Sequence, residues 1–120
     1  MEPSFSEHEL RHAAHGYTRR MTYANVGALG VRAGKRDELV AILTRRSDAL
    51  SEVGCLLYEV GTNDDEPDTV FVVELWESAE AHQASLKLES VRAAIAEAMP
   101  ILSGEMGGYR FTVAGSPLRG

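Results

Sequence analysis

The sequence contains a single cysteine, Cys55, among its 120 residues. One thiol forms no intramolecular disulfide and cannot supply a cysteine-rich zinc site. Basic residues are also scarce, with 12 Lys and Arg against 18 Asp and Glu, and the formal net charge at pH 7 is −6. This is the wrong sign for a protein that binds the phosphate backbone of nucleic acids. The composition therefore excludes a disulfide scaffold and argues against a nucleic-acid partner.

Long apolar runs are missing as well. No stretch approaches the roughly 18 consecutive apolar residues of a membrane-spanning helix, so we expect no membrane partner. The first residues, MEPSFSEHELRH, lack the basic segment and apolar run of a secretory signal. With 44% hydrophobic and 25% charged residues, the chain has the composition of a soluble globular protein of one domain. We expect it in the cytoplasm.

The N-terminal segment contains one metal-binding pattern. HELRH, residues 8–12, fits the H-E-x-x-H motif, in which two histidines hold zinc and the glutamate activates a water. A third ligand is lacking, because His15 would lie about 10 Å from His8 along a helix, too far for one zinc ion with bonds near ~2 Å. We interpret the match as chance and residues 1–20 as a polar extension. Weak metal binding by its histidines stays open.

From residue 21 onward, strand and helix signals alternate. β-Branched and aromatic runs predict strands over residues 21–34, 55–61, 69–76 and 107–115. Apolar residues at helical spacing predict helices over residues 35–53 and 79–98, the second with a bend near residues 88–90. Ser78 is a suitable N-cap for the second helix.

The order strand, helix, strand, strand, helix, strand is typical of a ferredoxin-like α+β fold, with an antiparallel sheet and both helices on one face. The other face of such a sheet would expose Val, Leu and Phe side chains to water. Pairing two sheets across a two-fold axis would cover them. We therefore expect residues 21–120 to form one ferredoxin-like domain that assembles as a homodimer.

The stretch VFVVELWESAEAHQASL, residues 70–86, carries the sole tryptophan, Trp76. Because side chains alternate along a strand, Val70, Val72, Glu74 and Trp76 share one face. Trp76 therefore ends a strand where a helix begins, at the mouth between sheet and helices. The pattern alone is equally consistent with a core or interface tryptophan.

Three segments, GCLLYEV, PDTVFVVELWESAEAHQASL and VRAAIAEAMPILSG, closely resemble the antibiotic biosynthesis monooxygenase family, including the quinol monooxygenases. The resemblance covers about residues 22–114. It implies a dimeric α+β barrel with a pocket between sheet and helices in each subunit. It also implies oxidation of a hydroxylated aromatic, anthrone-like or quinol substrate by O₂ without metal or flavin, since the deprotonated substrate supplies the electrons.

The resemblance also implies site residues. Polyketide-oxidising members use a tryptophan, an asparagine four residues before it, and an asparagine on the first strand. Trp76 and Asn25 match two of these, and Val72 occupies the third position without a donor. His82 stands where an anthrone-oxidising member has a tyrosine, and its imidazole can act as a base near neutral pH. We expect a pocket bounded by these four residues, with His82 as base and Asn25 and Trp76 holding the substrate oxygens.

Departures from the family pattern leave alternatives open. Many members carry histidines nine and fourteen residues past the tryptophan, where this chain has Ser85 and Ser90. Haem-degrading relatives use a histidine on the second helix, and its absence from AAIAEA argues against haem degradation. A non-catalytic dimer that binds a small apolar ligand in the same pocket is the alternative function. For His82, the alternative is a surface residue in the first turn of the helix.

Overall fold

The computed structural model describes residues 21–119, so HELRH and the predicted extension over residues 1–20 lie outside the described residues. The strands are β1 (Tyr23–Val31), β2 (Cys55–Gly61), β3 (Thr69–Trp76) and β4 (Leu102–Thr112). The helices are α2 (Arg36–Leu43), α3 (Asp48–Glu52), α4 (Ala79–Ser85) and α5 (Glu89–Ala98), followed by the 3-10 turn η1 (Met99–Ile101).

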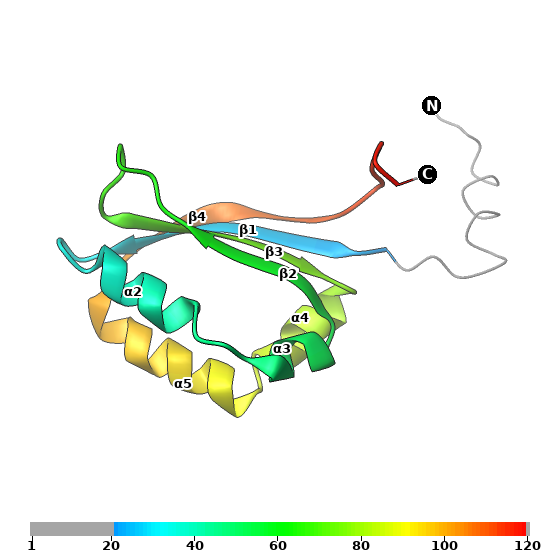
Figure 1. Ribbon diagram of the computed structural model, residues 1–120, viewed down its shortest axis with the longest axis horizontal. Helices are drawn as coiled ribbons and strands as arrows, with labels where there is room; N and C mark the ends of the chain where they lie inside the picture. Colours follow the sequence, from blue (N-terminus) through cyan, green and yellow to red (C-terminus); the bar gives the residue numbers. More distant parts are fainter. Residues whose placement is uncertain (1–20, 120) are drawn as a thin grey trace, which may run out of the picture.

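The strands form one sheet in the order β2-β3-β1-β4. Each neighbouring pair is antiparallel. Within residues 21–119, helices α2, α3, α4 and α5 all lie on the same face of the sheet (Figure 1). This topology confirms the predicted ferredoxin-like α+β fold.

The first helical stretch differs from the prediction. The sequence predicts one helix over residues 35–53, but α2 and α3 are separate helices. Thr44 Oγ1 donates a hydrogen bond to the Val40 carbonyl oxygen at 2.7 Å, and such back-bonding by a hydroxyl side chain favours a bend. Ser47 is then extended, with φ −145°. The prediction of one continuous helix was wrong, because the apolar residues keep their helical spacing across the break between α2 and α3.

The second helical stretch bends close to the predicted position. α4 and α5 lie on either side of residues 86–88. Ser78 is the N-cap of α4, as expected, because its Oγ accepts a hydrogen bond from the Ala81 N–H at 3.0 Å. The cap fixes the first turn of α4 directly after β3, so the residues of this turn stay close to the end of that strand.

The last strand begins earlier than predicted. The sequence predicts residues 107–115, but β4 pairs with β1 from Leu102 onward, where Leu102 lies opposite Val31. The segment SGEMGG, residues 103–108, is polar and glycine-rich and therefore lacks a strand pattern. Pairing with β1, rather than local propensity, makes it a strand.

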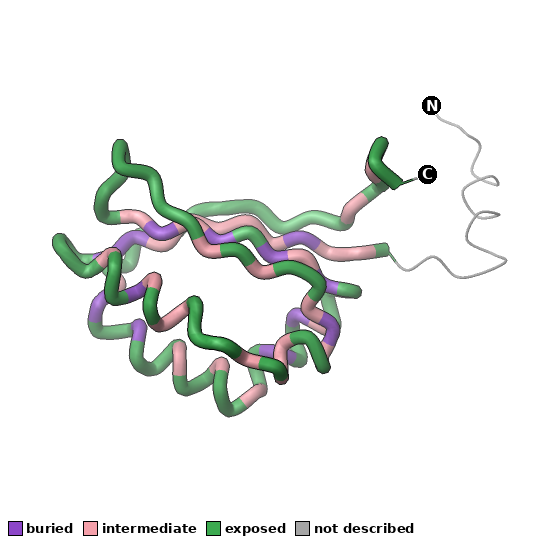
Figure 2. The backbone as a smooth tube through the Cα atoms, in the orientation of Figure 1, coloured by how far each residue is buried: buried purple, intermediate pink, exposed green. Residues whose placement is uncertain are grey.

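The apolar core lies on the helix-facing side of the sheet, at the end where β1 leads into α2. Leu39 of α2 and Val70 of β3 are fully buried there. The whole cluster consists of Val31, Leu39, Val70, Ala98 and Ile101. Buried and less buried residues alternate along β3, whereas β4 is exposed along nearly its whole length (Figure 2).

The opposite face of the sheet carries apolar side chains that remain in contact with solvent. They include Leu57, Val73, Tyr109 and Phe111, of which Tyr109 is 76% exposed. Strand register places Val73, Val26 and Tyr109 in one row across this face. The structure thus contains the exposed apolar face from which the sequence predicts a homodimer.

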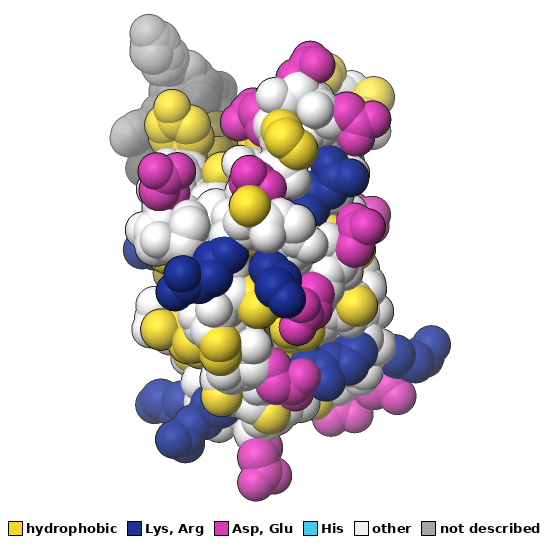
Figure 3. Space-filling view, turned by 90° about the vertical axis from the view of Figure 1, so that its left-hand side faces the viewer, with side chains coloured by type: hydrophobic (Ala, Val, Ile, Leu, Met, Phe, Trp, Pro, Cys, Tyr) yellow, Lys and Arg dark blue, Asp and Glu magenta, His cyan; other side chains and the backbone are white. Residues whose placement is uncertain are grey.

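One end of the molecule carries charges of both signs. At the end of the molecule shown in Figure 3, acidic and basic side chains lie among one another. In residues 21–119, no helix is long and apolar enough to cross a membrane.

Candidate active site

Four polar side chains form a row across the helix-facing side of the sheet, one from each strand. Tyr58 of β2 pairs with Glu74 of β3, Glu74 pairs with Asn25 of β1, and Asn25 pairs with Arg110 of β4. Directly paired residues of antiparallel strands point to the same face. We call Tyr58, Glu74, Asn25 and Arg110 the polar row.

Glu74 is the centre of this row and is only 7% exposed. Its Oε2 accepts a hydrogen bond from Asn25 Nδ2 at 3.0 Å, and its Oε1 accepts one from Trp76 Nε1 at 2.9 Å. A buried carboxylate needs such donors to offset its lost hydration. Each carboxylate oxygen has a second lone pair, so Glu74 can still accept further hydrogen bonds.

His82, on α4, is a close neighbour of Glu74. Its Nε2 is 3.8 Å from Glu74 Oε1. The imidazole contacts Trp76 edge-on, with ring centroids 5.3 Å apart, and lies 5.7 Å from the ring of Tyr23. Its Nδ1 is buried, with no hydrogen-bond partner among the described residues. His82 is therefore a buried residue, which excludes the alternative of a surface histidine.

A cavity of about 560 Å³ lies over the polar row. Its lining residues all come from the four strands: Asn25, Val26, Gly27, Leu29, Tyr58, Val72, Glu74, Met106, Gly107, Gly108, Tyr109 and Arg110. The helices pack mainly on β2 and β3, and the lining residues of β4 are exposed. The cavity therefore opens to solvent along β4.

A pair of glycines accounts for the hollow. Gly27 and Gly108 lie opposite each other on β1 and β4, one step from the polar row on the same face. A Cβ on Gly27 would approach Val72 Cγ2 to 3.3 Å. Gly108 has φ +136°, and a Cβ there would collide with the backbone of Val26. Without side chains at this pair, the floor beside Glu74 is open, and its apolar surface comes from Leu29, Val72 and Met106.

The sequence-predicted site residues fall into two groups. Asn25 and Val72 line the cavity, whereas Trp76 and His82 do not. Trp76 is 1% exposed and directs its indole N–H to Glu74. Both residues of the second group therefore contact the cavity only through Glu74.

Sequence reasoning missed Glu74, Tyr58 and Arg110. For Glu74 a signal existed, because it is the only charged residue in the strand TVFVVELW and shares a face with Val72 and Trp76. A charge at the centre of an apolar strand face indicates a partnered or functional group. Arg110 had no comparable signal, because its position depends on the register between β1 and β4.

Two other polar groups near Glu74 keep their protons. Burial, then the charge of Glu74, and then Cys55 raise the pKa of Tyr58, so its hydroxyl is a hydrogen-bond donor at neutral pH. Burial also raises the pKa of the Cys55 thiol, and the charge of Glu74 adds to this against the lowering effect of the Leu57 backbone. Cys55 is therefore a poor nucleophile.

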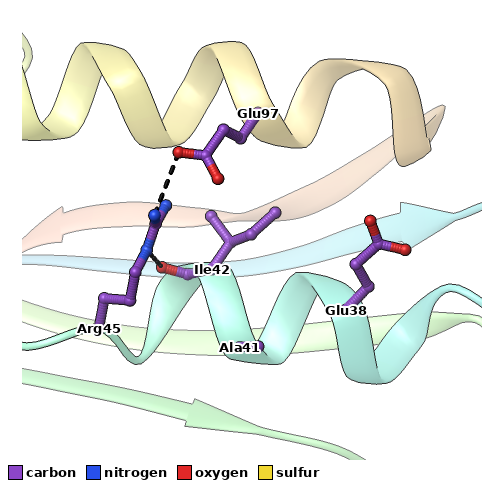
Figure 4. A pocket seen from close by; sticks show the side chains of 5 residues that line it. All are labelled: Glu38, Ala41, Ile42, Arg45 and Glu97. Carbon is purple, nitrogen blue, oxygen red and sulfur yellow. Dashed lines mark hydrogen bonds and ion pairs between the residues drawn. The ribbon is translucent and has the colours of Figure 1, made fainter.

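A second hollow lies on the helix layer and differs in kind (Figure 4). It has a volume of about 440 Å³ and is lined by Glu38, Ala41, Ile42, Arg45 and Glu97. Arg45 Nη1 already pairs with Glu97 Oε2 at 3.1 Å, and both side chains are about half exposed. Hydrated, paired charges of this sort hold a ligand weakly. The polar row is thus the better candidate site.

Metal ligands are not grouped in the part of the chain that the structure describes. No set of three or more His, Cys, Asp or Glu side chains there could hold a metal ion. A buried carboxylate beside a cavity, on a ferredoxin-like sheet, instead defines a small α+β protein with a candidate small-molecule pocket.

The comparisons narrow this class to one family. The model of the antibiotic biosynthesis monooxygenase family matches residues 22–97, more than half of the chain. The chain therefore belongs to the antibiotic biosynthesis monooxygenase family, as the sequence resemblance indicates. A comparison with curated proteins gives no match.

Solved structures agree with this assignment. A protein from Chloroflexus aurantiacus J-10-fl, itself only provisionally an antibiotic biosynthesis monooxygenase, is 34% identical, covers 79% of this chain and 95% of its own, and gives a TM-score of 0.69. Two similarly assigned proteins share the fold at lower identity. That from Caulobacter crescentus CB15 is 21% identical over 87% of this chain and 99% of its own, with a TM-score of 0.67. The protein from Nitrosomonas europaea is 10% identical over 82% of this chain and 95% of its own, with a TM-score of 0.71.

Proposed function

We propose that the protein is a cofactor-independent monooxygenase that oxidises a hydroxylated aromatic, anthrone-like or quinol substrate with O₂. Family membership supports the monooxygenase class. The observation that carries the reaction is Glu74, a buried carboxylate with spare acceptor capacity on the wall of a cavity with an apolar floor. A phenolic or enolic hydroxyl placed against Glu74 can transfer its proton to the carboxylate.

The chemistry follows from that proton transfer. The substrate anion gives one electron to O₂, and the two radicals combine to form a carbon–oxygen bond. The resulting hydroperoxide loses water, so the CH₂ group of an anthrone plus O₂ becomes a carbonyl group plus H₂O. In a quinol, the same steps at a ring C–H give a hydroxyquinone plus H₂O. One oxygen atom stays in the product, and the substrate supplies both electrons needed to reduce the other. Deprotonation is the step that the protein can accelerate by general-base catalysis.

The residues around Glu74 have supporting roles in this proposal. Asn25 and Trp76, which the sequence assigns to the substrate oxygens, donate their N–H groups to Glu74 and hold its carboxylate in place. His82, whose Nε2 is 3.8 Å from Glu74 Oε1, does not line the cavity and can act on the substrate only through the carboxylate. The Tyr58 hydroxyl lines the cavity and can donate to the substrate oxyanion.

An oxygen-electrode assay with an anthrone and with a hydroquinone tests the proposal. We expect O₂ uptake that depends on the protein, and with ¹⁸O₂ one labelled oxygen atom in each product molecule. The alternative, a non-catalytic protein that binds small ligands, predicts ligand binding without O₂ uptake above the rate of the free substrate. That outcome would overturn the enzyme proposal.

We also propose that two copies associate through the face of the sheet that carries Leu57, Val73, Tyr109 and Phe111. These side chains are exposed although they are large and apolar, and a second sheet can cover them. Light scattering should then give twice the chain mass of 13.1 kDa. Replacing Val73 by Asp should shift the mass toward that of one chain. The control is Ile95→Asp, because Ile95 is also an exposed apolar residue but lies on α5, and its replacement should leave the mass unchanged. A wild-type mass of one chain at micromolar concentration would contradict the dimer.

A further inference from the structure

We infer that the ligand of this cavity is an aromatic hydroxy acid, whose anionic group binds Arg110 while its hydroxyl faces Glu74. This deepens the proposed function and rests on it for the role of Glu74. The starting observation is the charge pattern of the lining. It contains one carboxylate, Glu74, and one guanidinium, Arg110, at different positions along the polar row.

Arg110 has a charge that the described residues do not neutralise. Among residues 21–119, no carboxylate forms an ion pair or hydrogen bond with it. It is exposed, on the strand along which the cavity opens. A guanidinium presents two parallel N–H donors that match a carboxylate. An unpaired arginine at the mouth of an apolar cavity is thus a suitable site for a ligand carboxylate.

The separation of Glu74 and Arg110 suits a ligand that carries a ring system between two polar groups. Glu74 and Arg110 stand on β3 and β4, which flank β1. Neighbouring strands lie about 4.8 Å apart, so the two backbones are about 10 Å apart. Gly27 and Gly108 line the floor of the same cavity and offer no side chain. A flat apolar body can therefore lie over the glycines, with one polar group at each end.

The two charges also fix the orientation of such a ligand. Glu74 repels an anionic group from the buried end of the cavity, so the ligand carboxylate is favoured only at Arg110. The protein as a whole carries a net charge of −6, which disfavours anions elsewhere on the surface. Met106 of β4, 68% exposed, borders the mouth and can adapt to ring systems of different width.

The test compares a hydroxynaphthoic acid with the matching naphthol under anaerobic conditions, so that binding is measured without turnover. Quenching of Trp76 fluorescence, checked by calorimetry, gives both dissociation constants. We expect the wild-type protein to bind the acid about tenfold more tightly than the naphthol, the size of one charge-assisted contact that is partly exposed. This preference should weaken as salt is raised.

Three variants assign the preference to Arg110. In Arg110→Gln, the acid should lose its advantage while naphthol affinity stays within about twofold, because an exposed substitution perturbs the fold little. Arg110→Lys should restore part of the preference, since lysine keeps the charge but not the paired donors. Arg92→Gln, on the exposed side of α5 and outside the lining, is the matched control and should resemble wild type. Thermal unfolding confirms that each variant is folded.

The outcomes separate this inference from the proposed function. Equal affinity of wild type for the two ligands, or a preference that survives in Arg110→Gln, would overturn the inference. Neither result affects O₂ uptake with a neutral anthrone, which tests the monooxygenase. Conversely, a preference lost in Arg110→Gln, combined with no O₂ uptake, would retain the ligand class and reject the enzyme.

Discussion

The two ends of β3 face the helices in different ways. At its start, Val70 is fully buried beside Leu39 in an apolar cluster. At its end, Glu74 and Trp76 are also buried, but a carboxylate accepts hydrogen bonds there and the imidazole of His82 lies nearby. Between them, Val72 is buried and lines the cavity. One strand thus provides apolar burial at one end and a polar site at the other.

This difference indicates where stability and chemistry reside. Burial of apolar side chains is the main favourable term in folding, and the core end supplies it without polar groups. Burying a charge costs free energy that only its partners recover. A charge retained at the other end, beside a cavity, is therefore better explained by function than by stability. Substitutions at the two ends should separate the two properties.

The largest expected effect is at the core end. Leu39→Ala should lower the free energy of unfolding by about 2–5 kcal/mol, because it removes a fully buried side chain and leaves a cavity. Urea denaturation measures this. The control is Ile95→Ala on α5, where the side chain is 47% exposed and the loss should be well below that of Leu39→Ala. Equal losses in the two variants would show that the Val70 end does not dominate stability.

The next effect is at the polar end. Glu74→Gln should lower turnover by about 10²–10⁴-fold, the range for a general base. It should cost only about 1–3 kcal/mol of stability, since the amide nitrogen of glutamine cannot accept a hydrogen bond and one of the donors Asn25 and Trp76 loses its acceptor. Steady-state O₂ uptake is compared with that of Glu105→Gln, an exposed carboxylate on β4. Turnover of Glu74→Gln within about twofold of wild type would remove Glu74 from the mechanism.

The contrast between these ends could be predicted only in part from the sequence. The bounds of β2 and β3 and the Ser78 cap follow from local patterns of β-branched, apolar and capping residues, and all were predicted correctly. The hydrogen-bond partners of Glu74 cannot be predicted from such local patterns. Asn25 is 49 residues away in the chain, and only the register between β1 and β3 brings the two together.

The strand register also explains why the sequence does not predict Arg110 at the mouth of the cavity. Arg110 reaches the polar row because β4 pairs with β1 in one alignment, and a slip of one residue would turn it to the other face. β4 itself begins in a glycine-rich segment with no strand pattern. The predicted roles of Asn25 and Trp76 in holding the substrate, and of His82 as the base, therefore stay predictions, although the structure does gather all three around Glu74.

A smaller loss of turnover is expected at His82, next to Glu74 on α4. The sequence alone suggests about 10²-fold loss for His82→Ala, the size of a general-base contribution. Because His82 contacts the cavity only through Glu74, we now expect about tenfold, as for a positioning residue. The informative readout is the split between kcat and KM. The value of kcat should fall in His82→Ala while KM stays near that of wild type, and His82→Gln, which keeps a polar side chain beside Glu74, should recover part of kcat. An unchanged kcat in His82→Ala would make His82 a packing residue.

The smallest effect is at Tyr58, on the cavity wall next to Glu74. Burial and the charge of Glu74 raise the pKa of Tyr58 above its ordinary value near 10. The folded protein therefore holds this proton more tightly than the unfolded chain does. Its contribution to stability is complete below about pH 10 and is lost as the pH rises from there toward the folded pKa.

Tyr58→Phe should remove this alkaline loss. Unfolding free energies measured near pH 8 and above pH 10 should differ less in Tyr58→Phe than in wild type, and absorbance titration should lose its most alkaline tyrosinate component. Turnover should fall by less than about tenfold, because the variant removes one neutral donor and leaves the carboxylate in place. A late component that persists in Tyr58→Phe would show that the tyrosine on the cavity wall is not held protonated by its buried position and by Glu74.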